Sequence, residues 1–249
     1  MLTRTLTAIA AVLPTSLKYR IARLKPVYAS AMAWQQTLVR VETRAGVLNW
    51  HMDGYASQSY IRGSYEPYMQ EGFLRFVHPG TVVYDVGAHV GFHALFCGLL
   101  AGRSGRVFAF EPDPQCRASL ERQIAANPPL PLVALPYALS DRRGELPLDT
   151  SKGSSQSRLH AEGNLLVEAT SVDSLVQDAG LPPPHVIKID VEGHEAAVLR
   201  GAKATLVRYR PVVLCDYNDD STLQVVQALL NPLGYEVQAG PPVTAKACQ

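Results

Sequence analysis

The sequence predicts an α/β protein with a mostly parallel sheet, helices on both faces and a helical N-terminal arm. From residue 80 onward, short β-branched runs alternate with helical stretches, a pattern typical of strands joined by crossover helices. A glycine-rich turn follows the first of these strands. With 47% apolar and 18% charged residues, the 249-residue chain has enough apolar side chains for one large packed core.

The N-terminal residues 1–60 are predicted to form a basic, amphipathic helical arm. Six of the 23 basic residues and none of the 22 acidic residues lie in residues 1–41, where apolar residues recur at near-helical spacing around Pro14. Three interpretations stay open: a helix on an anionic membrane surface, a cleavable targeting peptide, and a helical lid on the main domain. We favour the lid, because a single-sequence pattern of this kind is weak support for the other two.

The main domain, residues 61–249, consists of strands and helices in alternation. The expected strands are Thr81–Val86, Arg106–Phe110, Leu132–Leu139, His185–Val191, Pro211–Asp216 and a final strand that includes Tyr235–Gln238. The expected helices lie at about 91–101, 114–126, 172–179, 194–208 and 220–231. Pro-rich patches at 128–131, 182–184 and 241–242 are typical of turns between elements.

One segment of the main domain, residues 141–169, does not follow this alternation. It is polar, rich in Gly and Ser, and has no helical period. We expect a hairpin or loop insertion between the third strand and the next helix. Insertions of this kind commonly carry substrate contacts, so we place it on the substrate side.

Composition also narrows the function classes. A net charge of only +1 argues against extended nucleic-acid binding. No apolar run approaches the ~18 residues that a membrane-spanning helix needs. The 4 cysteines are widely spaced and form no C-x-x-C, which argues against a zinc module and a disulfide scaffold and fits a reducing compartment. We therefore expect a cytoplasmic protein, and if the protein contacts a membrane surface, residues 1–41 are the part expected to do so.

The first strand ends in an acidic, glycine-rich turn, Asp85-Val-Gly-Ala-His-Val-Gly91. Glycines let the backbone approach a ligand, and the following helix N-terminus offers unpaired N–H groups. A dinucleotide site has the spacing G-x-G-x-x-G, whereas here three residues separate Gly87 from Gly91. A carboxylate at Asp85 would repel a pyrophosphate but suits the cationic S-adenosylmethionine. The alternative is an ordinary strand–helix turn.

The second strand also ends in an acid, Glu111, followed by Pro112. In doubly wound folds an acid at this position accepts hydrogen bonds from ribose hydroxyls. Nicotinamide and S-adenosylmethionine sites share the feature, so it indicates a ribose without deciding between them.

Several further blocks occur in a fixed order along the chain. They are Asp85-Val-Gly-Ala-His-x-Gly91, Phe110-Glu-Pro112, Ala138-Leu-Ser-Asp141, Ile187-Lys-Ile-Asp-Val-Glu-Gly-His-Glu195, Val198-Leu-Arg-Gly-Ala202 and Arg210-Pro-Val212. Together they resemble the FkbM-type family of S-adenosylmethionine-dependent O-methyltransferases over about residues 60–240. The resemblance implies a class I methyltransferase (Rossmann-like) fold, S-adenosylmethionine as the cofactor, and methyl transfer to a hydroxyl of a small molecule, sugar or glycan.

The resemblance also implies a set of cofactor-binding residues. These residues hold the methionine end, the ribose or the adenine side of the cofactor, or lie in the segment before the first strand. They are Asp85, Gly87, His89, Gly91, Glu111, Pro112, Ser140, Asp141, Asp190 and Glu66. At position 89 the family usually has Asn. His89 also donates a hydrogen bond, and it can add a pH dependence.

Asp190 and His194 are the predicted catalytic residues. The fourth strand carries Asp190 to the carboxyl edge of the sheet, where ligands bind in open α/β sheets. Transfer from a sulfonium is an in-line displacement, so alignment and desolvation supply much of the rate. An alcohol has a high pKa, so a base within hydrogen-bond reach helps, and His194 and Asp190 are the candidates for it, with His89 a distant third.

A metal ion is the alternative to such a base. Asp190, Glu192 and His194 are conceivable ligands, but their spacing at a strand–helix turn does not force them to converge. His89 and His93 lack the intervening acid of a zincin helix. We predict that no metal is bound.

Two other functions stay open. One is a nicotinamide-dependent oxidoreductase on a similar sheet, against which the missing third glycine and Asp85 both count. The other is a non-catalytic binding protein that retains the fold, against which the presence of Asp85, Glu111 and Asp190 counts.

Overall fold

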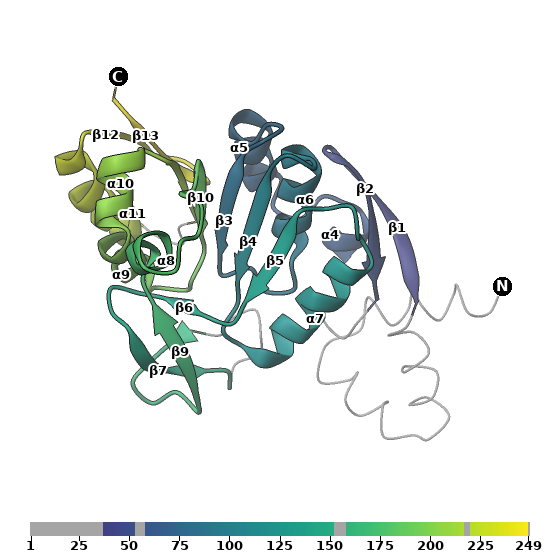
Figure 1. Cartoon of the computed structure of the whole chain (residues 1–249), viewed down its shortest axis with the longest axis horizontal. Coiled ribbons are helices and arrows are strands. Elements are labelled where there is room, and N and C mark those ends of the chain that lie inside the picture. Colours follow the sequence, from purple (N-terminus) through teal and green to yellow (C-terminus); the bar gives the residue numbers. More distant parts are fainter. Residues whose placement is uncertain (1–36, 53–57, 152–157, 217–219, 249) are drawn as a thin grey trace. The chain divides into compact units, whose positions relative to one another are not determined.

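The computed structural model describes residues 37–52, 58–151, 158–216 and 220–248 (Figure 1). The chain divides into two compact units, Met1–Glu66 and Pro67–Gln249, so the boundary falls a few residues after the predicted one. None of the helices in the described residues is long and apolar enough to cross a membrane.

The first unit contains a β-hairpin where the sequence predicts helix. Strands β1 (Leu38–Thr43) and β2 (Gly46–His51) pair antiparallel, and the short helix α4 (Gln58–Ile61) follows. The helical prediction is therefore wrong for residues 38–51. Side chains alternate there between buried and exposed positions, as the buried Leu48 and Trp50 illustrate, and this period of two favours strand over helix. Residues 1–36 of the predicted arm lie outside the described residues.

The second unit is built on a seven-stranded sheet with the order β12-β13-β11-β10-β3-β4-β5. Five neighbouring strands, from β5 to β11, run parallel, and β13 is antiparallel to both of its neighbours. The strands are β3 (Val82–Val86), β4 (Arg106–Phe110), β5 (Leu132–Leu135), β10 (Val186–Ile189), β11 (Val212–Cys215), β12 (Tyr235–Gln238) and β13 (Val243–Ala247). The predicted mostly parallel sheet is confirmed, but β13 was not predicted.

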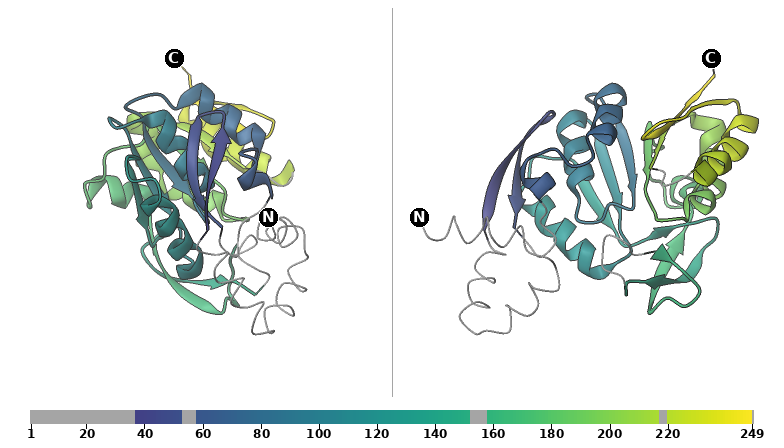
Figure 2. Two further views of the ribbon diagram at one scale, coloured as in Figure 1. Left: turned by 90° about the vertical axis from the view of Figure 1, so that its right-hand side faces the viewer. Right: turned by 180° about the vertical axis from the view of Figure 1, so that it is seen from behind.

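Helices cover both faces of this sheet (Figures 1 and 2). One face packs against α8, α9, α10 and α11 in a large apolar cluster, and α6 packs against the other face beside α5. The helices are α5 (Pro67–Phe76), α6 (Phe92–Ala101), α7 (Pro114–Ala125), α8 (Val172–Gln177), α9 (Glu195–Gly201), α10 (Lys203–Tyr209) and α11 (Asp220–Leu230).

Two predicted elements are divided in the structure. The helix predicted over 194–208 is two helices, α9 and α10, which meet at Ala202. The neighbouring Gly201 lies so close to the carbonyl oxygen of Ser140 that a Cβ would be 1.9 Å from it. The strand predicted over Leu132–Leu139 ends at Leu135, directly before Pro136.

The segment after Pro136 enters a second, four-stranded sheet with the order β6-β9-β7-β8. Its strands are β6 (Ala138–Leu139), β7 (Gly144–Asp149), β8 (Arg158–Leu159) and β9 (Leu165–Thr170). Strands β7 and β9 pair antiparallel, and a small apolar cluster that includes Leu146 and Val167 covers one side. Residues 141–169, for which the sequence suggests a hairpin or loop insertion, contribute β7, β8 and most of β9 to this sheet.

Candidate active site

The turn between β3 and α6 has a backbone that only certain residues adopt. Gly87, His89 and Gly91 all have positive φ angles, of 77°, 50° and 93°. At Gly87 a Cβ would lie 1.9 Å from the carbonyl oxygen of Asp190, so no other residue fits without moving the backbone. The glycine therefore allows the ends of β3 and β10 to approach each other.

A buried charge cluster lies beside this turn. Asp85 on β3 and Lys188 on β10 are direct partners in the parallel register, and Lys188 Nζ is 3.1 Å from Asp85 Oδ1. The two side chains are only 1% and 2% exposed. Lys188 Nζ also donates to the Gly87 carbonyl at 2.8 Å and lies 3.4 Å from Asp190 Oδ2. Burial raises the pKa of Asp85, while the charge of Lys188 opposes that rise.

Glu111, at the end of β4, ties the second strand to the first turn. The backbone N–H of His89 donates to its Oε2 and that of Asp113 to its Oε1, each at 2.8 Å. Pro112 lies between Glu111 and Asp113, and Asp113 is the N-cap of α7. Burial raises the pKa of Glu111 to about 7.

The side chain of His89 is uncharged at neutral pH. Burial lowers its pKa to about 4, and the charge of Lys188 contributes in the same direction. The pH dependence that the sequence suggested for His89 is therefore not expected between pH 6 and 8. Its backbone N–H, rather than its ring, makes the contact with Glu111.

A second group of contacts joins Ser140 to the start of α9. Ser140 Oγ is 2.9 Å from His194 Nε2 and donates to Asp141 Oδ1 at 3.4 Å. Arg200 Nε donates to Asp141 Oδ2 at 2.9 Å and lowers the pKa of that carboxyl. Burial lowers the pKa of His194 below its usual value. The structure thus brings a predicted adenine-side residue, Ser140, against a predicted catalytic residue, His194.

Other acids lie on the segment after β10 and at the end of the next strand. Burial raises the pKa of Glu192, and the charge of Asp190 adds to that effect. Glu195 accepts from the N–H of Gly193 at 3.0 Å, which gives it a local structural contact. Asp216, directly after β11, accepts from the Tyr68 hydroxyl at 3.1 Å.

Sequence reasoning missed Lys188 and Asp216 as members of this region. A lone Lys in the otherwise apolar strand β10 was a signal, but its partner depends on the register between two strands. Glu66 was predicted near the cofactor; it belongs to the first compact unit, and its role stays a prediction. Among the described residues, no group of three or more His, Cys, Asp or Glu side chains is arranged to hold a metal ion.

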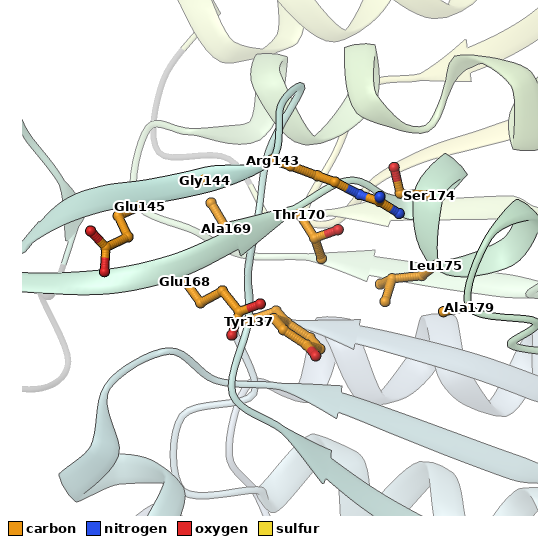
Figure 3. Close-up of a pocket in the computed structure, with 10 residues that line it drawn as sticks. All are labelled: Tyr137, Arg143, Gly144, Glu145, Glu168, Ala169, Thr170, Ser174, Leu175 and Ala179. Atoms are coloured by element: carbon orange, nitrogen blue, oxygen red, sulfur yellow. The ribbon is translucent and has the colours of Figure 1, made fainter.

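A pocket of about 420 Å³ lies between the second sheet and α8 (Figure 3). It contains none of the predicted site residues. Figure 3 shows Arg143 beside Ser174 at one end and Glu145 at the other. Glu145 and Glu168 are cross-strand partners on β7 and β9, and Arg143 forms an ion pair with Asp178. The pocket belongs to the insertion and is a different place from the turn after β3.

The mostly parallel sheet with helices on both faces has the class I methyltransferase fold that the resemblance implied. The structure is similar to that of precorrin-6y C5,15-methyltransferase from Geobacter metallireducens GS-15, with a TM-score of 0.51 and 16% identity. The similarity covers 78% of this chain and 93% of that chain, and it shows a shared fold.

A match between the sequence and a family model identifies the protein family. The family model described as methyltransferase FkbM domain matches residues 85–237, which is more than half of the chain. The chain therefore belongs to the FkbM methyltransferase family, and the resemblance seen in the sequence is confirmed.

Two curated relatives cover part of the chain. Hexuronic acid methyltransferase AglP of Haloferax volcanii is 35% identical over 122 residues, which are 48% of this chain and 49% of AglP. 2-O-methyltransferase NoeI of Sinorhizobium fredii is 27% identical over 162 residues, which are 57% of this chain and 65% of NoeI. The chain thus spans about half of AglP and just under two thirds of NoeI.

Proposed function

We propose that this chain is an S-adenosylmethionine-dependent O-methyltransferase that acts on a hydroxyl of a sugar or another small molecule. The observation that carries the proposal is the placement of Asp85, Glu111 and Asp190 around one glycine-rich turn at the ends of parallel strands. Membership of the FkbM family supports methyl transfer. The names of the relatives, a hexuronic acid methyltransferase and a 2-O-methyltransferase, support a sugar-like acceptor.

The residues of the turn fit this cofactor. When bound, S-adenosylmethionine supplies a methyl group activated on a positively charged sulfur. The ammonium of Lys188 faces the two carboxylates of Asp85 and Asp190, so an excess of negative charge suits the cationic methionine end. Glu111 accepts one N–H on each oxygen and keeps further lone pairs, which suit ribose hydroxyls.

His194 is the proposed general base. Its Nε2 lies 2.9 Å from Ser140 Oγ, and which of the two atoms donates there depends on the tautomer of the ring. Because burial lowers the pKa of His194 below 6.5, the ring is neutral at pH 7 and able to accept a proton.

Asp190 is assigned to cofactor binding and alignment. Its carboxylate already faces Lys188 Nζ at 3.4 Å, while its backbone N–H donates to the Val86 carbonyl at 3.1 Å. Both contacts fix it against the end of β3, beside the turn proposed to hold the cofactor.

The insertion is proposed to form the acceptor side. Strand β6 leads directly into Ser140, which contacts His194, so the second sheet is attached to the proposed base.

The proposed function is tested by calorimetric measurement of cofactor binding, followed by measurement of methyl-transfer turnover. The purified chain is titrated with S-adenosylmethionine and, separately, with NAD, and then incubated with methyl-labelled S-adenosylmethionine and a panel of free, nucleotide-linked and lipid-linked sugars that includes uronic acids. We expect binding of S-adenosylmethionine, none of NAD, and a base-stable labelled product. Binding of NAD alone would favour an oxidoreductase. Binding of S-adenosylmethionine without transfer to any acceptor would favour a binding protein that retains the fold.

A further inference from the structure

The strand β10 places one charged side chain in an otherwise apolar, fully buried run. Ile187 and Ile189 point into the large apolar cluster shared with α8 to α11. Because side chains alternate along a strand, Lys188 points to the opposite face of the sheet, where α6 packs. It is 2% exposed, among the most deeply buried side chains of the protein.

The contacts of Lys188 join three separate segments. Its Nζ lies 3.1 Å from Asp85 on β3, donates to the Gly87 carbonyl in the turn at 2.8 Å, and lies 3.4 Å from Asp190 after β10. An ammonium has three N–H donors, which equals the number of these acceptors. One side chain thus connects both proposed cofactor carboxylates and the turn between them.

These contacts fix the peptide group between Gly87 and Ala88 at both ends. Its carbonyl accepts from Lys188, and its N–H, on Ala88, donates to the Phe110 carbonyl at 3.0 Å. The orientation of this peptide determines where the rest of the turn points. Lys188 therefore holds the turn from the side of the sheet.

The stability of the fold does not by itself require a buried ammonium. Burying a charge is costly, and apolar side chains of similar size often support a fold equally well or better than a buried ion pair. An uncompensated carboxylate at the same place is much less favourable, since a buried acid without a counter-ion takes up a proton. A role of Lys188 at the proposed cofactor site explains why a buried ammonium is present despite its desolvation cost.

We infer, on the basis of the proposed function, that Lys188 is the positioning residue of the cofactor site: it keeps Asp85 in its charged form and fixes the Gly87 turn so that both can bind the cationic methionine end of S-adenosylmethionine. Lys188 itself lies behind these groups and is not expected to touch the methyl group.

The first measurement needs neither a variant nor a ligand. The carboxyl carbon signal of Asp85 is followed by NMR in the wild-type protein as the pH is changed. We expect an ionised Asp85 at pH 7, and a protonated Asp85 at that pH would overturn the inference. The other titratable groups that interact electrostatically with Asp85 or Lys188 are Asp190, His89, His93, Cys97, Glu111 and Cys215, so the signal is assigned with Asp85→Asn.

The second measurement compares Lys188→Met with Ile187→Met. The control introduces the same side chain one position earlier on β10, facing away from the charge cluster. We expect Lys188→Met to raise the pKa of Asp85 and to weaken S-adenosylmethionine binding at least tenfold, about 1.4 kcal/mol, with Ile187→Met close to wild type. Folding of both variants is checked by near-UV circular dichroism, and Lys188→Arg, which keeps the charge, should restore part of the affinity.

The outcomes separate this inference from the proposed function. If the wild-type protein binds no S-adenosylmethionine, the proposed function fails, whereas the Asp85 titration still tests the role of Lys188. A folded Lys188→Met with an unchanged Asp85 titration and normal affinity overturns the inference. If that variant does not fold, the wild-type titration decides.

Discussion

Glu111 places a carboxylate in a buried position where its protonation is linked to folding. Its pKa is raised by burial to about 7, above the ordinary value of 4.5. A group whose folded pKa is raised favours the folded state most below its unfolded pKa, and that contribution is lost as the pH rises through the folded pKa. The relevant window is therefore about pH 4.5 to 7.

We expect Glu111→Gln to remove this pH dependence. Relative to the variant, the free energy of unfolding of the wild-type protein without ligand should fall by roughly 3 kcal/mol between pH 4.5 and pH 8. Urea unfolding of both proteins across this range measures the difference. Parallel curves would mean that Glu111 does not titrate in this window.

His194 carries the proposed proton transfer. We expect His194→Ala to lower turnover by roughly 10²–10⁴-fold with little change in S-adenosylmethionine affinity, because a general base contributes in this range. The wild-type rate should decline on the acid side only below pH 6.5, since burial lowers the pKa of the imidazole. Asp190→Asn serves as the contrast and should weaken both turnover and binding. Near-normal turnover of His194→Ala at saturating acceptor would rule out the base assignment.

Among the elements, the turn from β3 into α6 has a tight steric requirement at Gly87. We expect Gly87→Ala to be severely destabilising, since its Cβ would meet the Asp190 carbonyl at 1.9 Å in addition to the strain of a φ of 77°. Gly180→Ala is the control, because Gly180 has a φ of 70° and nothing within 4 Å of a Cβ. That change should cost only the ~1–2 kcal/mol of a left-handed backbone. Chemical unfolding of both variants compares them, and equal losses would contradict the close approach.

Local sequence patterns predicted most helices and strands. The contacts within the site were not predictable, because they depend on how segments far apart in the sequence are aligned. The strand Arg106–Phe110 has the predicted bounds, because β-branched and aromatic residues between turn signals specify it locally. The hairpin at 38–51 was not predicted, because the helical arm was predicted over residues 1–60 although the helical spacing of apolar residues ends at Leu24. The contact between Ser140 and His194 requires two segments far apart in the sequence to meet, and no local signal encodes that.

At the scale of the whole molecule, the strong basic charge of residues 1–41 calls for a separate test. The lid interpretation predicts that the full-length protein stays in the supernatant with anionic liposomes at low salt, and that removing residues 1–36 changes turnover but not S-adenosylmethionine affinity. Sedimentation with the liposomes and activity of both forms are the measurements. Cosedimentation that is lost on truncation and suppressed by salt would instead support a membrane-surface helix.

The strand order also has a consequence for synthesis on the ribosome. Strand β13 is the last in the sequence, yet it lies between β11 and β12, and β12 pairs with no other strand of the described residues. As the chain emerges from N-terminus to C-terminus, the parallel strands β3, β4, β5, β10 and β11 can assemble first. Strand β12 must then wait without a partner until residues 243–247 have left the exit tunnel. A chain that ended just before residue 243 would therefore lack β13 and leave β12 unpaired, so the sheet would lose two paired strands and not one.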